Sequence, residues 1–300
     1  MKLVELVPNF SEGKNLNVIN KIAETVNSFE NAELLDIQKD SLHNRSVFTI
    51  VVPLENAAAL ATGLVKTASE NISMEEHRGS HPRFGATDVM PFIPLEDTTM
   101  EECIELSQLV GKNVGEELKI PVYMYAMSAL KAEREKLEDI RNMHFQYEDL
   151  KEHIGEEKYR PDYGPSVVGT AGAVIIGARD FLIAYNIYIN TDNIITGRHI
   201  ASAIRAKNGG YSTVKSLAFK DGPSIQLSMN LTDYKRTPIY RVFEAVRMEC
   251  RRYGIEPVRS EFIGMVPAAA IVESLNYYLN SDLNIEKIVD LEYLKKLKPS

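Results

Sequence analysis

The chain has 300 residues, 44% of them hydrophobic and 25% charged, and its 42 acidic and 34 basic residues give a net charge of −8. This length and composition can bury a large core in two domains or in one large domain, which excludes an intrinsically disordered chain. No apolar run approaches the roughly 20 residues of a membrane span, and Glu5 and Pro8 interrupt the segment where a signal peptide needs an apolar core. We therefore expect a cytoplasmic protein.

The first half of the chain alternates between strand-like and helix-like segments. Short runs of apolar and β-branched residues predict strands at residues 2–7, 33–37, 46–52, 86–94 and 121–127. Apolar residues spaced three and four apart predict helices over residues 19–29, 57–68 and 99–118, the last opened by a capping box at Thr99 and Glu102. The charged segment 129–160 is expected to form a surface helix and irregular chain.

The second half repeats this alternation. Strands are predicted at residues 174–176, 181–189, 214–219, 225–231 and 258–264. A helix from about residue 195 is expected to stop at a left-handed cap around Gly209, and another is expected to run from an N-cap at Thr237, with Pro238 as its first residue, to Tyr253. Two more helices are predicted over residues 268–279 and 285–297.

The element order predicts an α+β fold. Each half contains the order β-α-β-β-α-β, which is typical of a ferredoxin-like (split β-α-β) unit. We expect two such subdomains, residues 1–172 and 173–300, with mixed or antiparallel sheets, helices on one face and a ligand groove between them. The Gly- and Pro-rich segment 150–173 marks the boundary.

Basic residues are concentrated in the second half. Residues 195–220 contain five basic residues and no acidic one, and residues 235–259 contain seven basic residues against three acidic ones. An acidic protein with such stretches is expected to bind a small polyanion rather than nucleic acid, although solvated helix faces would give the same pattern. The two cysteines, Cys103 and Cys250, are too few and too far apart for a disulfide framework or a thiolate zinc site.

The loop at residues 75–88 carries the densest group of polar residues. His77 and His81 have the spacing of a helical zinc site, but Gly79 and Pro82 disfavour the helix that such a site needs, so we predict no metal. An imidazole that titrates near neutral pH suits proton transfer, and Pro82 restricts the backbone of His81. Arg83 can bind a substrate carboxylate through two hydrogen bonds. The alternative is a structural loop histidine.

Two further polar loops adjoin predicted strands. Asn9 follows the first strand, and Asn44 and Arg45 precede the strand at 46–52. Loops at strand ends often assemble binding sites, so these three residues are candidates for substrate binding, although turn and cap roles explain them equally well. The chain has neither a G-x-x-x-x-G-K-S/T phosphate loop nor a G-x-G-x-x-G motif after its first strand.

Several motifs resemble those of the formiminotransferase family. They are VPNFSEG at 7–13, HNRSV at 43–47, HRGSHPRFGATDV at 77–89, PFIP at 91–94, PDYGPS at 161–166 and FLIAYN at 181–186. The resemblance covers nearly the whole chain. It implies transfer of a formimino group from N-formimino-L-glutamate to N5 of tetrahydrofolate in histidine degradation, by a homodimer without a metal.

The resemblance also implies roles for particular residues. The catalytic base of the family corresponds to His81. The folate-contacting segment corresponds to Gly164, Pro165, Ser166, Val167, Val168, Gly169, Thr170, Ala171 and Gly172. The animal enzymes append a cyclodeaminase domain, and we expect this chain to be the form without it.

Two departures from the family pattern leave the donor open. Gln38 stands where relatives commonly carry a second Asp after Asp36, and the folate segment is a residue shorter than in the animal pattern. The first alternative is a formyltransferase that makes 5-formyltetrahydrofolate from N-formylglutamate. The second is a folate-binding module that has lost the chemistry, against which the retention of Asn44, His81 and Arg83 argues.

Overall fold

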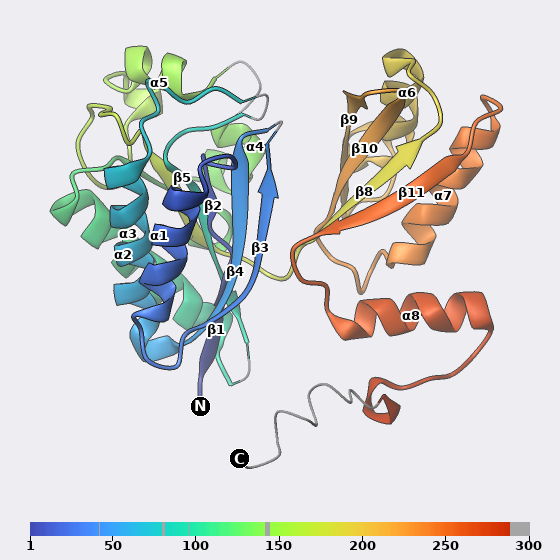
Figure 1. Ribbon diagram of the computed structural model, residues 1–300, viewed down its shortest axis with the longest axis horizontal. Helices are drawn as coiled ribbons and strands as arrows, with labels where there is room; N and C mark the ends of the chain where they lie inside the picture. Colours follow the sequence, from blue (N-terminus) through green and yellow to red (C-terminus); the bar gives the residue numbers. More distant parts are fainter. Residues whose placement is uncertain (42, 80–81, 96, 142–144, 289–300) are drawn as a thin grey trace. The chain divides into compact units, whose positions relative to one another are not determined.

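The chain divides into two units, Met1–Asp180 and Phe181–Ser300. The computed structural model describes residues 1–41, 43–79, 82–95, 97–141 and 145–288 (Figure 1). The boundary follows Asp180, whereas the sequence suggested one after Gly172. The reason is that strand β7 (Val174–Ala178), assigned by sequence to the second subdomain, pairs in parallel with two strands of the first unit.

The first unit is built on one mixed sheet. Its strands are β1 (Leu3–Leu6), β2 (Asn9–Phe10), β3 (Glu33–Asp40), β4 (Arg45–Pro53), β5 (Thr87–Pro94), β6 (Val122–Met124) and β7. β1 and β2 both pair antiparallel with β4 on one side and β5 on the other, and β3 pairs antiparallel with β4. Beyond β5, the parallel strands β7 and β6 complete the sheet.

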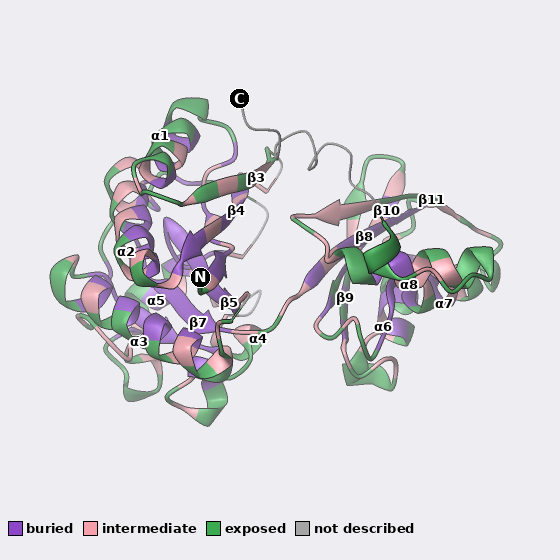
Figure 2. Ribbon diagram, turned by 90° about the horizontal axis from the view of Figure 1, so that it is seen from below, coloured by how far each residue is buried: buried purple, intermediate pink, exposed green. Residues whose placement is uncertain are grey.

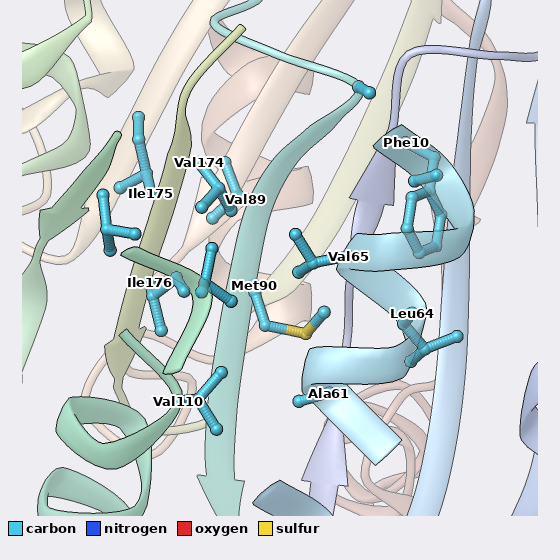
Figure 3. Packing of buried hydrophobic residues seen from close by; sticks show 14 of the residues in the cluster. Phe10, Ala61, Leu64, Val65, Val89, Met90, Val110, Val174, Ile175 and Ile176 are labelled. Atoms are coloured by element: carbon cyan, nitrogen blue, oxygen red, sulfur yellow. The ribbon is translucent and has the colours of Figure 1, made fainter. Parts of the chain in front are cut away.

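Three long helices form a single layer against this sheet (Figure 1). They are α1 (Leu16–Asn27), α2 (Leu54–Asn71) and α3 (Met100–Glu117). Figure 3 shows Ala61 and Val65 of α2 and Val110 of α3 facing Met90 of β5, which is fully buried. The predicted capping box is confirmed, because the Thr99 hydroxyl accepts from the backbone N–H of Glu102 and the Glu102 carboxylate accepts from that of Thr99.

The charged segment after β6 is more ordered and more buried than its composition suggests. Its short elements are the 3₁₀ turns Ala126–Ser128, Ala132–Arg134 and Glu157–Tyr159 and the helices α4 (Leu137–Ile140) and α5 (Tyr147–His153). Arg134 is buried and pairs with Asp162 at 2.7 Å, and Tyr147 and Leu150 belong to the hydrophobic core. The segment is therefore part of the first unit's core rather than a surface appendage.

The second unit has a four-stranded antiparallel sheet in the order β11-β8-β10-β9. Its elements are β8 (Ile183–Ile189), α6 (Ile194–Ile204), β9 (Val214–Asp221), β10 (Ser224–Leu231), α7 (Ile239–Arg251), β11 (Pro257–Ile263) and α8 (Ala268–Leu279). In both units the buried residues lie in the strands and on the sheet-facing sides of the helices (Figure 2).

Helix ends in the second unit differ from the sequence predictions by a few residues. α6 stops at Ile204, and the left-handed Gly209 ends a separate 3₁₀ turn instead. Pro238 occupies the N-cap of α7, so the helix begins one residue later than expected. Only a 3₁₀ turn, Ile285–Lys287, forms at the start of the predicted last helix, and residues 289–297 of that prediction lie outside the described residues. Across the described ranges, no helix is both long and apolar enough to span a membrane.

Candidate functional site

The loop between α2 and β5 runs beside the segment predicted to contact folate. The Met74 N–H donates to the Thr170 carbonyl at 2.8 Å, and the Ala86 N–H donates to the Ala171 carbonyl at 2.8 Å. Gly85 and Gly172 form an isolated β-bridge. Two stretches far apart in sequence, the histidine-rich loop and the predicted folate segment, are thus joined by backbone hydrogen bonds at both ends of the loop.

Glycines make this close approach possible. A Cβ on Gly85 would lie 2.2 Å from the Ala173 carbonyl oxygen, and one on Gly172 would lie 2.3 Å from that of Phe84. Gly172 also has a φ of +74°, a conformation that favours glycine. Residues 169–172 line a shallow pocket of about 190 Å³ together with Ser69, Leu118, Lys119 and Ile120.

The predicted catalytic residue, His81, lies outside the described residues, as does Ser80. The chain on either side of them is described. Before them, Gly79 packs so closely on the 43–44 loop that a Cβ would lie 2.2 Å from the His43 carbonyl oxygen. After them, Arg83 is buried and donates its guanidinium hydrogens to three side chains. The structure therefore fixes the two flanks of the predicted catalytic position.

Asn44, a predicted substrate-binding residue, connects three loops of this chain. Its Oδ1 accepts from the Gly13 N–H at 3.0 Å, and its Nδ2 donates to the Arg78 carbonyl at 3.1 Å. Its own carbonyl accepts from His77 Nε2 at 2.9 Å. Asn44 adopts a left-handed φ of +50°, which asparagine tolerates better than most residues. In the structure it organises the loops around the site.

His77 is held as a neutral imidazole. Because Nε2 donates to the Asn44 carbonyl, Nδ1 is left as the acceptor, and it receives the Arg83 Nε–H at 3.2 Å. Burial lowers the pKa of His77, and the positive charge of Arg83 lowers it further. The hydrogen bond to the Asn44 carbonyl acts in the opposite direction but is outweighed. A protonated His77 would have no acceptor for Arg83, so this arrangement is a structural one.

Arg83 binds a carboxylate, but that of its own chain. Its Nη1 and Nη2 donate to the two oxygens of Glu148 at 2.8 and 2.6 Å, and Nη1 also donates to Gln146 at 3.1 Å. This is the guanidinium that we predicted to bind a substrate carboxylate. Sequence reasoning recognised the chemistry of the guanidinium but missed its partner, which lies 65 residues away in a segment expected to form only surface structure.

Asn9 and Arg45 lie on the sheet face opposite the helices. Asn9 is paired with Val47, two residues from Arg45, so both side chains point to the same side, whereas the neighbouring Phe10 packs in the core. Asn9 Nδ2 donates to the Val7 carbonyl at 3.0 Å. Gln38 is paired with Val47 from the other side and shares this face. The structure thus brings Asn9, Arg45 and Gln38 to one face of the sheet.

Charged groups that sequence reasoning missed surround Arg45. Burial lowers the pKa of Arg45 to about 10, and the positive charge of Arg141 lowers it as well. The negative charges of Asp88 and Asp40 raise this pKa but do not outweigh burial. Asp88 is 1% exposed, accepts from the Phe84 N–H at 2.7 Å and forms an ion pair with Arg141. Asp88 could have been suspected from its place in the loop motif, whereas nothing in the sequence singles out Arg141.

Glu5 is a buried carboxyl group on the same face, because it is paired with Val51 of β4. Burial raises its pKa to about 7, against the attraction of Arg179. Arg179 also hydrogen-bonds to Tyr125, whose own pKa is raised by burial. Among the described residues, no group of three or more His, Cys, Asp or Glu side chains is arranged to hold a metal ion.

We expect Glu5→Gln to stabilise the protein at alkaline pH. The folded-state pKa of about 7 lies above the ordinary value of 4.5, so ionisation favours the unfolded state progressively from about pH 4.5 to pH 7. The variant should therefore gain about 3 kcal/mol of unfolding free energy over the wild type at pH 8 and almost nothing near pH 4. Urea unfolding at both pH values measures this. The control is Glu33→Gln, because Glu33 is exposed and is paired with the same Val51. An equal gain of stability in the control would contradict the raised pKa of Glu5.

Comparison with known proteins identifies the family. Two family models match, the N-terminal subdomain of the formiminotransferase domain over residues 3–179 and the formiminotransferase domain over residues 184–296. The chain is 56% identical over 281 residues to glutamate formimidoyltransferase of Thermoplasma acidophilum, covering 93% of each protein. It is 42% identical to the Streptococcus pyogenes protein of that name, covering 99% of this chain and 97% of the relative.

The animal relatives are longer. Formimidoyltransferase-cyclodeaminase of Mus musculus is 36% identical over 301 residues, which cover 94% of this chain and 53% of the mouse protein. The two family models meet between residues 179 and 184, where the structure divides into its two units. These matches confirm the resemblance seen in the motifs, and the chain belongs to the formiminotransferase family.

Proposed function

We propose that this protein is a glutamate formimidoyltransferase, which transfers the formimino group of N-formimino-L-glutamate to N5 of tetrahydrofolate and releases L-glutamate. The observation that carries this proposal is the 56% identity to a relative of that name, which extends through both units. The backbone hydrogen bonds of Met74 and Ala86 to Thr170 and Ala171 support it, because they join the described ends of the histidine-rich loop to the segment that we expect to contact folate.

In this reaction His81 acts as general base and general acid. N5 must be unprotonated to attack the formimino carbon, and the amine of glutamate must regain a proton when it leaves. One imidazole with a pKa near neutrality can accept the first proton and return it in the second step. We assign the folate to residues 164–172 and the anionic groups of the substrates to the sheet face that carries Asn9 and Arg45. Asn44 connects the loops that contain Gly13 and Arg78 through its side-chain hydrogen bonds.

Arg45 suits this role because of its surroundings. Its lowered pKa reflects a guanidinium in a partly dehydrated position close to a second guanidinium, that of Arg141. A bound carboxylate would stabilise both charges, and N-formiminoglutamate and the glutamate tail of the folate each supply one.

The neutral Gln38 gives a specific reason to test the formyl donor. It lies on the same face as Asn9, where an aspartate would add a negative charge, so the two donors meet a less acidic surface than in relatives with the second Asp. Incubation with tetrahydrofolate and each donor, followed by absorbance of the 5-formimino and 5-formyl products, separates the possibilities. We expect the formimino product. The formyl product alone would favour the formyltransferase, and tight folate binding without either product would favour a non-catalytic folate-binding module.

Several features of the assembly belong to the same proposal. The second unit's order β-α-β-β-α-β and strand order β11-β8-β10-β9 support a ferredoxin-like assignment. In the first unit β1, α1, β3, β4, α2 and β5 follow the same order, with the short strand β2 added after β1. We place the protein in the cytoplasm, where it serves histidine degradation. Exposed apolar side chains on α8, among them Tyr277 and Leu279, support a homodimer.

A further inference from the structure

Helix α5 contacts the histidine-rich loop at both ends of that loop. At one end, the Tyr147 N–H donates to the Arg83 carbonyl at 3.0 Å. At the other, the Tyr147 hydroxyl donates to Glu75 at 3.1 Å, and Lys151 forms an ion pair with the same carboxylate. The helix thus holds the two positions that bracket the proposed catalytic residue.

The contact between Glu148 and Arg83 is the strongest of these interactions. The two carboxylate oxygens meet Nη1 and Nη2 at 2.8 and 2.6 Å, which is the bidentate geometry that fixes a guanidinium in orientation as well as position. The Arg83 side chain is 10% exposed and that of Glu148 is 59% exposed. Arg83 holds the pKa of Glu148 below its ordinary range, so the carboxylate stays charged.

The orientation of Arg83 determines the state of His77. With Nη1 and Nη2 held by Glu148, Nε points at His77 Nδ1 at a distance of 3.2 Å, and this bond exists only while His77 is neutral. His77 Nε2 then holds the Asn44 carbonyl, and Asn44 in turn holds Gly13 and Arg78. Besides Arg83, the charged groups that act on His77 are Glu12 and Asp88.

We propose that Glu148 is a positioning residue for the transfer reaction: by orienting Arg83 it fixes His77, and with it described residues on either side of the proposed base. This inference rests on the proposed function. A shift of about 1 Å in a positioned catalytic group can cost about 100-fold in rate, so the orientation of Arg83 is expected to affect turnover.

The first test compares Glu148→Gln with Glu152→Gln, an exposed glutamate of the same helix for which the structure gives no contact to the loop. We expect Glu148→Gln to lower kcat about 10- to 100-fold. The KM for tetrahydrofolate should stay close to that of the wild type, and kcat is compared below the melting temperature of each variant, because Glu148→Gln leaves the buried Arg83 without its carboxylate. Glu152→Gln should match the wild type in all three. Wild-type kcat in Glu148→Gln would overturn the proposal.

A double-mutant cycle asks whether Glu148 acts through Arg83. If it does, the variant Arg83→Ala/Glu148→Gln loses no more kcat than Arg83→Ala alone, because the orientation that Glu148 provides is already absent. If the fold-losses in kcat of the two single variants multiply in the double variant, Glu148 acts by another route, and the proposal would be overturned.

The hydrogen bonds from Arg83 to Glu148 and to His77, here called the clamp, can be tested by NMR spectroscopy without measuring activity and without an Arg83 variant. In protein labelled with ¹⁵N-histidine, His77 should remain the Nε2–H tautomer and titrate below the ordinary pKa of about 6.5. In Glu148→Gln its pKa should move up towards that value, while in Glu152→Gln it should not move. An unchanged His77 in Glu148→Gln would overturn the clamp. A wild type without transferase activity but with this signature would refute the proposed function and leave the clamp intact.

Discussion

Replacing His81 with alanine is expected to lower turnover by about 10²–10⁴-fold, which is the usual contribution of a general acid–base group. The variant should still bind tetrahydrofolate, because the proposed contacts to the folate come from residues 164–172. Backbone hydrogen bonds from Met74 and Ala86 help to hold this segment. Single-turnover kinetics, together with fluorescence titration of tetrahydrofolate, separate the loss of chemistry from a loss of binding.

His199→Ala is the matched control, because this histidine is exposed on α6 of the second unit and has no part in the loop. It should leave turnover unchanged. The acid limb of the pH–rate profile adds a second criterion, because a base with a pKa near neutrality should produce such a limb in the wild type and its loss should flatten the profile. Near-normal turnover of His81→Ala would remove this residue from the mechanism.

Local sequence patterns were sufficient wherever the structure depends on neighbours in the chain. The capping box at Thr99 and the strand-helix order of the second unit follow from residue types a few positions apart, and the structure confirms both. The three long helices of the first unit were likewise indicated by their apolar spacing. These are cases in which one face of an element must be buried whatever it packs against.

The choice of partner was not predictable in the same way. The apolar run at residues 174–178 indicates a buried strand but not which sheet buries it, so the domain boundary was placed too early. Arg83 was expected to bind a substrate carboxylate, and the sequence gives no sign that its guanidinium pairs with Glu148. Both pairings join segments that are distant in sequence, and they depend on the tertiary fold and not on local propensity.

Motif residues pose a further difficulty, because structural and chemical roles occur within a single loop. His77 and Asp88 flank the proposed base, yet the first is a neutral link between Asn44 and Arg83 and the second is a buried ion-pair partner. The residue type alone suggests the same chemistry for both histidines. Both ring nitrogens of His77 have partners within the protein, which gives His77 a structural role.

Asp88→Ala should be the most destabilising of the substitutions considered, with an expected loss of about 3–5 kcal/mol of unfolding free energy. Asp88 is 1% exposed and its removal leaves the Arg141 guanidinium, itself 10% exposed, without that carboxylate. The Phe84 N–H also loses its acceptor inside the core, and an unsatisfied buried donor adds to the cost. Urea unfolding followed by circular dichroism measures the change.

The control for this loss is a surface ion pair of the same unit. Glu156 pairs with His153, with both side chains about half exposed, and such pairs contribute little, so Glu156→Ala should unfold like the wild type. Adding Arg141→Met to Asp88→Ala should recover part of the lost stability, because it removes the charge left buried without its partner. Equal stability of Asp88→Ala and Glu156→Ala would show that Asp88 does not hold the loop. A double variant less stable than Asp88→Ala would show that Arg141 is stabilised by other groups around it.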